Sequence, residues 1–332
     1  MGGILCIFDG MTDGGFFFAD YPYFSRCLAS GAQGLLETTP PGRSPESLGC
    51  ILTLTGVPAD ELGAFSRGWI EALGQGVPFD RGDLLVRTTC VALDGAGRIG
   101  EATAQPETAE PGLHRIGSYQ GLLVVPGAAQ SLADIETFPP YEHPGAFARV
   151  LVPRGSAPLR DFTLRNITAD RALIPWGQAA PGQPRPKDAR ICFVCGAPIV
   201  RGIARALGAD LVVPPGATGD VDTDLAAKLA AALAAARTHE FVVLHLNGAD
   251  EASHRRDRAE KAAFLRRADE IIVRGLLADG GPVLLCADHG ADPATGAHLG
   301  GPQPFLLLGT RRRGAIGTFC GTSARRLLTE EN

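Results

Sequence analysis

Acidic and histidine side chains come directly after three apolar segments of this 332-residue chain. The six residues are Asp9 after ILCIF, Asp250 and His254 after FVVLHL, and Asp288, His289 and His298 after VLLCA. Open α/β sheets bind their ligands at the carboxyl ends of the strands. If the three segments are neighbouring strands, these side chains meet at one edge of a sheet.

Such a mixture of carboxylates and imidazoles suits Zn²⁺ or Mn²⁺. Asp250 and His254 are four residues apart, so one helical turn would aim both at the same point. Six protein ligands exceed what one tetrahedral site accepts, and two ions would clamp a phosphoryl group and lower the pKa of a nucleophile. The sequence therefore predicts two divalent metal ions and no organic cofactor. Taken singly, each residue also fits a helix cap or a hydrogen-bonded turn.

A nucleophile for this chemistry is available in the segment PPGRSPESLGCIL, which contains Ser44 and Ser47 before an apolar helix. Ser47 is the better placed of the two. At a helix N-terminus its oxygen could reach a metal while free N–H groups face a phosphate. The alternative is a serine that only caps the helix. The other histidines are expected in the core (His245) or in loops and at the surface (His114, His143 and His239).

Composition narrows the class of protein. Apolar residues make up 45% of the chain and charged residues 20%, which predicts a folded protein with a large core. The net charge of −5 provides no basic field for nucleic acid or an anionic membrane. No apolar run reaches about 18 residues, and Asp9 interrupts the apolar start that a signal peptide would need. We therefore expect a cytoplasmic protein with neither nucleic acid nor membrane as partner; the oligomeric state is not predicted.

The cysteines fit this expectation. The chain contains eight, several of them inside apolar runs, which is typical of reduced core thiols. The spacing of Cys192 and Cys195 also fits a redox or zinc site, but no second pair follows. We therefore interpret both as buried thiols.

Apolar strands alternate with helical patterns, which predicts an α/β fold with a mostly parallel sheet covered by helices. The expected strands are Ile4–Phe8, Gly34–Thr38, Ala189–Cys195, Leu211–Val213, Phe241–Leu246, Val283–Cys286 and Phe305–Leu308. The expected helices are Tyr21–Ser30, Ser47–Leu54, Ile199–Leu207, Thr223–Arg237 and Glu260–Leu277. Between residues 62 and 174 the helical signals thin out and β-rich pieces follow one another. We expect an inserted α+β domain there, within a core formed by residues 1–61 and 175–332.

The motifs resemble those of the archaeal-type cofactor-independent phosphoglycerate mutases, which belong to the alkaline phosphatase superfamily. The similarity runs nearly end to end. It includes ILCIFDGMTD, GLLETTPPGRSPES, SRGWIEALGQGVPFDRGDLLVR, PPGATGDVDTD, VVLHLNGADEASH and VLLCADHG. The resemblance implies an alkaline-phosphatase-like core, a lid formed by the inserted domain, and a small phosphorylated metabolite as substrate.

The resemblance also implies roles for individual residues. Ser47 would be the nucleophile that is transiently phosphorylated. One metal ion would be held by Asp9, Ser47, Asp288 and His289, and the second by Asp250, His254 and His298. The matching cations for the substrate are Arg67, Arg87 and Lys228, and for Lys228 a surface salt bridge is an equal alternative.

Two departures from the family pattern concern the substrate pocket. Leu48, Gly49, Cys50 and Ile51 stand where the family has Asp-Thr-Ala-Asn, and Gln120 follows Tyr119 where the family has Arg. Three interpretations follow. The first is interconversion of 2- and 3-phosphoglycerate. The second is a phosphatase or phosphotransferase acting on another small phosphorylated or phosphonate metabolite. The third is a non-catalytic binding protein, which the complete set of metal and nucleophile positions argues against.

Overall fold

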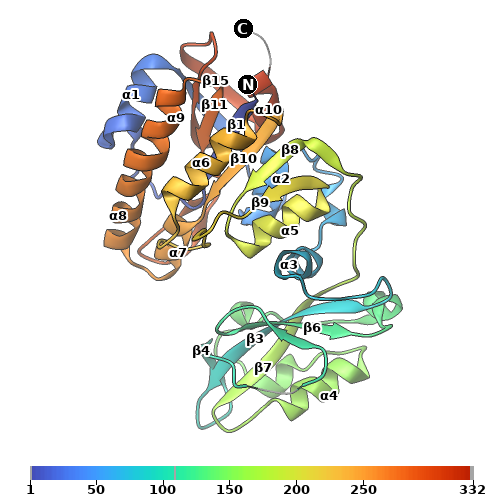
Figure 1. Cartoon of the computed structure of the whole chain (residues 1–332). Helices are drawn as coiled ribbons and strands as arrows, with labels where there is room; N and C mark the ends of the chain where they lie inside the picture. The colour runs from blue at the N-terminus through green and yellow to red at the C-terminus, as the bar shows by residue number, and fades with distance from the viewer. Residues whose placement is uncertain (1, 108–109, 330–332) are drawn as a thin grey trace. The chain divides into compact units, whose positions relative to one another are not determined.

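The computed structural model describes residues 2–107 and 110–329. The chain divides into two compact units, one formed by residues 1–63 and 184–332 and the other by residues 64–183 (Figure 1). The smaller unit extends past Ile174, where the sequence suggested a return to the core. The reason is that strand β7 (Arg171–Ala179) pairs with β3 (Leu84–Leu93) of the same unit.

The larger unit is built on an eight-stranded sheet. Its strands, in spatial order, are β15 (Gly314–Cys320), β2 (Ala32–Glu37), β14 (Gln303–Leu308), β11 (Val283–Cys286), β1 (Gly3–Phe8), β10 (Phe241–Leu246), β8 (Asp188–Val194) and β9 (Ala209–Val212). Only β14 runs against the other strands of this sheet. A short ribbon of β12 (Gly290–Ala291) and β13 (His298–Leu299) follows β11. The predicted α/β class with a mostly parallel sheet is confirmed.

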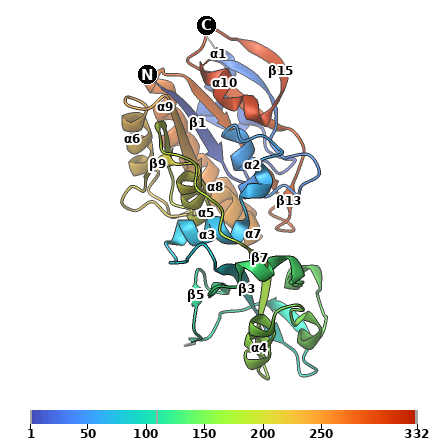
Figure 2. The same ribbon diagram turned by 90° about the vertical axis from the view of Figure 1, so that its right-hand side faces the viewer.

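Helices cover both faces of this sheet (Figures 1 and 2). One layer contains α1 (Pro22–Ser30), α6 (Leu225–Ala235), α8 (Arg258–Ala268) and α9 (Arg274–Asp279). The other contains α2 (Ser47–Leu54), α5 (Pro198–Ala206) and α10 (Ala324–Thr329). The short helix α7 (Gly248–His254) follows β10 directly.

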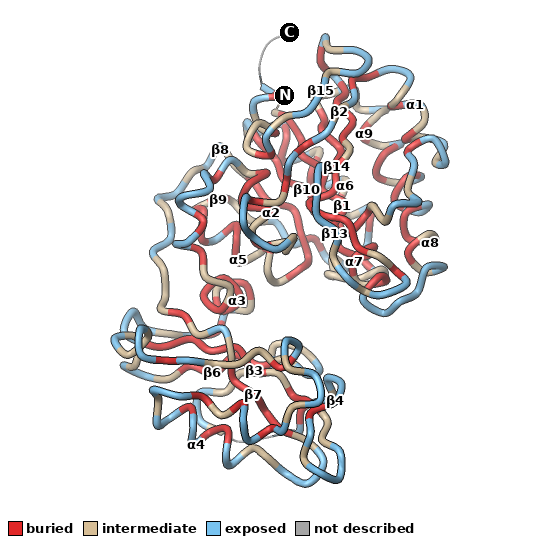
Figure 3. The backbone as a smooth tube through the Cα atoms, turned by 180° about the vertical axis from the view of Figure 1, so that it is seen from behind, coloured by how far each residue is buried: buried red, intermediate tan, exposed pale blue. Residues whose placement is uncertain are grey.

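The central strands are buried along their whole length, as Figure 3 shows. Strands covered by helices on both faces need apolar side chains in both directions, which explains the continuous runs GILCIF, FVVLHL and VLLC. The register aligns Ile7 of β1 with His245 of β10 and with Cys286 of β11. The residues that follow these strands therefore emerge at one edge of the sheet.

Several elements differ from the sequence expectations. Strand β15 was not predicted, because it is an exposed edge strand whose sequence GAIGTFC lacks an apolar pattern. The single helix expected over Glu260–Leu277 is interrupted by a π-helical turn, Asp269–Val273. There the Asp269 carboxylate accepts hydrogen bonds from the backbone N–H groups of Tyr23 and Phe24.

In its described residues, the smaller unit contains an antiparallel five-stranded sheet, two α-helices and several short 3-10 turns. It contains α3 (Arg67–Gln75), β3, β4 (Ile99–Ala102), β5 (Leu113–Arg115), β6 (Gln120–Val125), α4 (Ala157–Arg165) and β7. Neither helix was predicted. Helix α4 packs Leu159 and Phe162 against Leu84 and Val86 of β3, forming a core separate from that of the larger unit.

Within residues 2–107 and 110–329, no helix combines the length and the apolar character needed to cross a bilayer. Cys192 and Cys195 are free and buried, and burial raises their pKa to about 11 and about 12. A buried thiol that holds its proton is a core residue, in agreement with the interpretation from the sequence.

Candidate metal centre

Three of the predicted side chains form a wholly buried group, here called the buried cluster: Asp9, Asp288 and His289. Because β1 and β11 are parallel neighbours, the residues after Phe8 and after Cys286 are brought together. His289 Nε2 lies 3.3 Å from Asp9 Oδ1 and 3.5 Å from Asp288 Oδ2, and all three side chains are 0% exposed.

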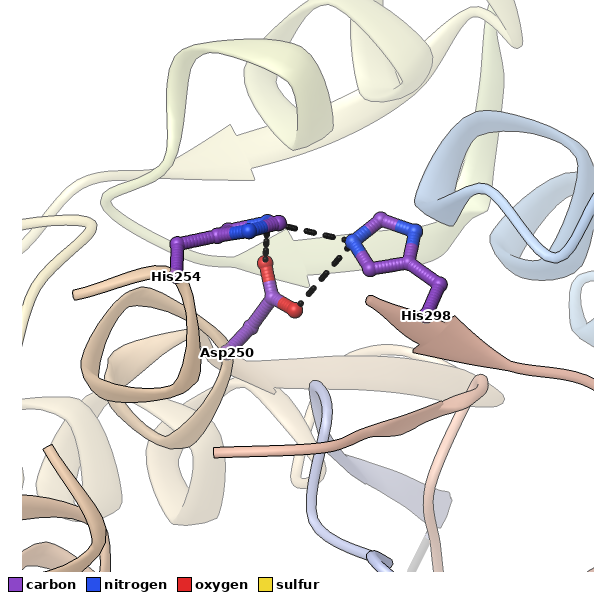
Figure 4. Close-up of side chains that lie close together, drawn as sticks. All are labelled: Asp250, His254 and His298. Carbon is purple, nitrogen blue, oxygen red and sulfur yellow. Dashed lines mark hydrogen bonds and ion pairs between the residues drawn. The ribbon is translucent and has the colours of Figure 1, made fainter. Parts of the chain in front are cut away.

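The other three form a half-exposed cluster: Asp250, His254 and His298 (Figure 4). Asp250 and His254 are one turn apart on α7, and His298 lies on β13. His254 Nε2 is 3.2 Å from Asp250 Oδ2, and His298 Nε2 is 3.5 Å from Asp250 Oδ1. The two Nε2 atoms are 3.1 Å apart, so three donor atoms converge on one point.

Ser47 lies beside the buried cluster. It is the first residue of α2, and its Oγ is 3.1 Å from His289 Nε2. The residue at the N-cap position is Glu46, so the alternative interpretation of Ser47 as the capping serine is wrong. Ser44, the other candidate, is exposed.

The two clusters adjoin each other. The rings of His289 and His298 stack with their centroids 4.1 Å apart and their planes inclined by 25°. Each ring has its Nδ1 beside a backbone carbonyl, at 3.0 Å from Gly290 O for His289 and at 2.8 Å from Pro45 O for His298. An Nδ1–H that donates to a carbonyl leaves the lone pair on Nε2, the atom that faces the cluster. Both imidazoles are therefore oriented as metal ligands are.

Buried carboxylate oxygens without partners test whether cations fit here. Asp9 Oδ1, Asp250 Oδ1 and both oxygens of Asp288 have no hydrogen-bond partner in the described part of the chain. Burial, with the neighbouring carboxylates of Asp288 and Asp250, raises the pKa of Asp9 well above its usual range, and burial raises that of Asp288. Buried charges require paired charges or coordinated metals. Divalent cations fit this donor set.

Electrostatics differ at the half-exposed cluster. Burial opposes ionisation of Asp250, but the imidazoles of His254 and His298, 3.2 and 3.5 Å from its oxygens, outweigh it and hold its pKa below the usual range. The hydrogen bond to Asp250 in turn raises the pKa of His254. This cluster neutralises part of its own charge.

Lys228 does not occupy the position expected of a substrate-binding cation. It is wholly buried, and its Nζ donates to the backbone carbonyls of Thr218, at 3.0 Å, and His245, at 3.3 Å. Burial lowers its pKa to about 8. The expectation of a substrate contact or a surface salt bridge at Lys228 is wrong, because α6 packs over β10 and encloses the side chain. Lys228 instead ties the PPGATG loop to the strand beside the site.

His245 is a core histidine, as expected, but its contact was not foreseen. Its Nε2 lies 3.0 Å from Asp9 Oδ2, and both side chains are 0% exposed. The sequence shows a histidine near the end of an otherwise apolar strand. Its contact with Asp9 could not be predicted from this, because the sequence does not show that β10 is the neighbour of β1.

Arg67 and Arg87 belong to the smaller unit and share one carboxylate. Arg67 Nε is 3.0 Å from Glu71 Oε1, and Arg87 Nε is 2.8 Å from Glu71 Oε2. Arg87 is buried and its guanidinium lies 4.1 Å from the ring centroid of Trp176, whereas the Arg67 side chain is 38% exposed. Of these two arginines, Arg67 is the one whose side chain stays partly exposed.

Comparison with known proteins agrees with this geometry. A family model described as the metalloenzyme superfamily matches residues 4–327. The chain is 29% identical to the 2,3-bisphosphoglycerate-independent phosphoglycerate mutase of Methanopyrus kandleri, over 93% of this chain and 86% of that protein. It is 27% identical to 2,3-bisphosphoglycerate-independent phosphoglycerate mutase 1 of Archaeoglobus fulgidus, over 90% of this chain and 85% of that protein.

Two solved structures share the fold. The PH0037 protein of Pyrococcus horikoshii has a TM-score of 0.66 at 20% identity, covering 99% of this chain and 96% of that one. The cofactor-independent phosphoglycerate mutase of Thermoplasma acidophilum has a TM-score of 0.57 at 17% identity, covering 99% of both chains. The resemblance to the archaeal enzymes is confirmed over nearly the whole length, and the chain belongs to the metalloenzyme superfamily.

Proposed function

We propose that this protein is a dimetal phosphotransferase that interconverts 2- and 3-phosphoglycerate through a phosphoserine at Ser47. The observation that carries the proposal is the position of Ser47 Oγ, 3.1 Å from His289 Nε2, beside carboxylates that lack partners. A hydroxyl next to a cation-binding cluster is the arrangement that phosphoryl transfer to a serine requires. The names of the archaeal relatives point to the same reaction.

Asp9, Ser47, Asp288 and His289 would hold one ion, and Asp250, His254 and His298 the other. Mn²⁺ and Zn²⁺ both suit this set of oxygen and nitrogen donors. When bound, such ions neutralise phosphoryl oxygens and lower the pKa of the serine hydroxyl.

The residues of the chain account for the rest of the reaction. Ser47 Oγ forms a bond to phosphorus as the bond from phosphorus to the substrate oxygen breaks, and the serine proton is transferred overall to the departing alkoxide. The alcohol stays bound, reorients, and takes the phosphoryl group back on its other oxygen. Because α2 begins at Ser47, the free N–H groups of its first turn face the charge that develops there.

The smaller unit supplies the remaining requirement of a mutase. Water that reached the phosphoserine would hydrolyse it, so the intermediate has to be covered. We assign this role to residues 64–183 as a lid, with Arg67 as the first candidate to contact a carboxylate or phosphate of the substrate. Its partly exposed side chain favours it over Arg87, which is enclosed by Glu71 and Trp176.

A second candidate function is favoured by the residues after the nucleophile. Leu48, Cys50 and Ile51 are buried apolar or thiol side chains, so the first turns of α2 offer few polar side chains to a substrate. Gln120, where the family has Arg, removes a cation from the lid. These changes favour a phosphatase or phosphotransferase that acts on another small phosphorylated or phosphonate metabolite.

One experiment separates the two functions. The purified protein, loaded with Mn²⁺ or Zn²⁺, is incubated with 3-phosphoglycerate, and the products are followed by ³¹P NMR. Formation of 2-phosphoglycerate without free phosphate supports the mutase. Free phosphate, or no turnover, favours the second function, and a screen of small phosphomonoesters then identifies the substrate class.

A further inference from the structure

His245 is a buried histidine with no role in the proposed reaction, and it contacts the Asp9 carboxylate of the buried cluster. His245 is the penultimate residue of β10, at the sheet edge that carries the site, and its Nε2 is 3.0 Å from Asp9 Oδ2. Neither side chain is accessible to solvent. What this contact does for the site rests on the proposed dimetal function, in which Asp9 holds a metal ion.

The state of the His245 ring follows from its surroundings. Nδ1 has no hydrogen-bond partner among the described residues. The other ring nitrogen, Nε2, faces the Asp9 carboxylate oxygen Oδ2 at 3.0 Å. A neutral imidazole carries one proton, and placing it on Nε2 allows it to be donated to the Asp9 carboxylate. His245 is thus a hydrogen-bond donor that faces a carboxylate.

This donor distinguishes the two oxygens of Asp9. Oδ2 is engaged by His245, whereas Oδ1 has no hydrogen-bond partner in the described chain and lies 3.3 Å from His289 Nε2. Asp250 of the half-exposed cluster contrasts with it, since each of its oxygens faces an imidazole of that same cluster. Among the three carboxylates of the clusters, and within the described part of the chain, Asp9 is the one that contacts a histidine belonging to neither cluster.

The backbone around His245 is held as well. Lys228 Nζ donates to the His245 carbonyl at 3.3 Å and to the Thr218 carbonyl at 3.0 Å. Asn247 Nδ2, two residues further on, donates to the Gly219 carbonyl at 2.8 Å. The PPGATG loop and α6 therefore fix the end of β10 and, with it, the direction of the His245 ring.

We propose that His245 is a positioning residue that orients Asp9 so that only Oδ1 is offered to the metal ion of the buried cluster. Partners of this kind, one step removed from the metal, typically change metal affinity by about 10- to 100-fold when they are lost. We expect the larger effect at the buried cluster, because in the described structure His245 is hydrogen-bonded to Asp9, and no hydrogen bond or ion pair joins it to Asp250, His254 or His298.

The test uses matched variants of the full chain. His245→Met removes the donor and His245→Gln keeps an amide N–H at the same reach. Each is combined with Asp250→Ala, which leaves only the buried cluster intact, or with Asp288→Asn, which leaves only the half-exposed cluster. The control is His239→Met, because His239 Nε2 also lies 3.0 Å from a carboxylate, Asp210 Oδ2, and His239 precedes β10 at the end opposite to the site. Affinity for Mn²⁺ and Co²⁺ is measured by calorimetry.

In the Asp250→Ala background we expect His245→Met to weaken metal binding about 10- to 100-fold and His245→Gln to restore it to within about threefold. In the Asp288→Asn background, as in the His239→Met control, metal affinity stays unchanged. Equal affinities for the Met and Gln variants, or an equal loss at both sites, would overturn the proposal.

A measurement on the wild-type protein does not depend on how the variants fold. In the Zn²⁺-loaded protein labelled with ¹⁵N-histidine, the buried ring that does not bind metal is expected to carry its proton on Nε2; a proton on Nδ1 would contradict the inference. Failure of the proposed function is recognised separately. A wild-type protein that binds two ions but leaves 3-phosphoglycerate unchanged refutes the mutase, while the metal affinities still test His245.

Discussion

The two clusters of the site contain similar ligands in different environments. Asp9, Asp288 and His289 are wholly buried, whereas the side chains of His254 and His298 are 44% and 23% exposed. The buried cluster has two carboxylates for one imidazole, and the half-exposed cluster has two imidazoles for one carboxylate. Their carboxyl pKa values accordingly move in opposite directions, upward for Asp9 and Asp288 and downward for Asp250.

The difference shows how each cluster depends on a cation. Without one, the buried cluster holds carboxylate oxygens that have no hydrogen-bond partner among the described residues. In the half-exposed cluster, Asp250 raises the pKa of His254, so this imidazole takes up a proton more readily and compensates the acid. We therefore expect a bound cation to contribute more to folding at the buried cluster, and the ion of the half-exposed cluster to exchange more readily.

A similar contrast is found in the smaller unit. Arg87 and Arg67 bind the same carboxylate, Glu71, but the first is enclosed and stacked on Trp176 while the second is partly exposed. Removing one partner of a buried ion pair leaves an uncompensated charge, and removing an exposed partner does not. Burial therefore separates positions that stabilise the fold from positions available for binding.

The largest effect is expected at Ser47, which adjoins the buried cluster. Ser47→Ala should lower phosphoryl transfer by at least about 10³-fold, because the acceptor oxygen is lost. Both metal ions should remain bound, since three protein ligands persist at the buried cluster. Turnover assays and metal analysis on the same preparation check both points. Unchanged activity would move the nucleophile to Ser44 or to a water molecule.

Removing one carboxylate from each cluster tests whether the clusters are separate sites. Asp288→Asn should lose one equivalent of metal and Asp250→Ala the other, each with a fall in activity of about 100-fold or more. His298→Ala should behave like Asp250→Ala. Metal is counted by mass spectrometry after dialysis against a weak chelator. Loss of both ions from either variant would show that the clusters act as one site.

Substitutions of the two arginines should have different effects: Arg87 is expected to affect the stability of the fold, and Arg67 the binding of substrate. Arg87→Met should lower the free energy of unfolding by about 3 kcal/mol, because the Glu71 carboxylate keeps only its exposed partner. Arg67→Ala should lower it by less than about 1 kcal/mol and raise KM by about 10-fold or more. Urea unfolding and steady-state kinetics measure the two effects. A KM change confined to Arg87→Met would reverse the assignment.

The smallest effect concerns pH. The folded pKa values of Asp9 and Asp288 lie above the ordinary 3.8, so the metal-free fold holds protons that the unfolded chain has lost, and it loses stability as pH rises beyond about 4. The raised pKa of His254 acts in the same direction: its stabilisation is complete below pH 6.5 and is lost as pH rises through the folded value.

Metal-loaded protein should behave in the opposite way, because protons compete with the ion for the same ligands. Melting temperatures measured from pH 5 to pH 8 with a chelator and with Mn²⁺ should therefore diverge as pH rises. Parallel curves would show that neither cluster stabilises the fold through a cation. Ser47→Ala, which keeps both clusters, provides the control.

Residue patterns alone located much of the fold. The bounds of β10, β11 and α2 coincide with the expected Phe241–Leu246, Val283–Cys286 and Ser47–Leu54. The patterns that predict them are local. Each strand is a continuous apolar run, and the helix is an apolar segment that is buried on most of its sides. By contrast, β15 is held only by pairing with β2, and its own residues carry no strand pattern.

The sequence by itself determined which residue types are available and at which strand ends they stand, so seven candidate metal and nucleophile positions could be named. The candidate ligand side chains come directly after apolar strands, and this order can be seen in the sequence itself. Only the tertiary structure decided which strands are neighbours. The partnership of His245 with Asp9, the enclosure of Lys228 beneath α6, and the burial of one cluster but not the other all depend on it. These are contacts between residues distant in the chain, and burial, which sets their charge and hydrogen bonding, is a property of the packed molecule rather than of any local pattern.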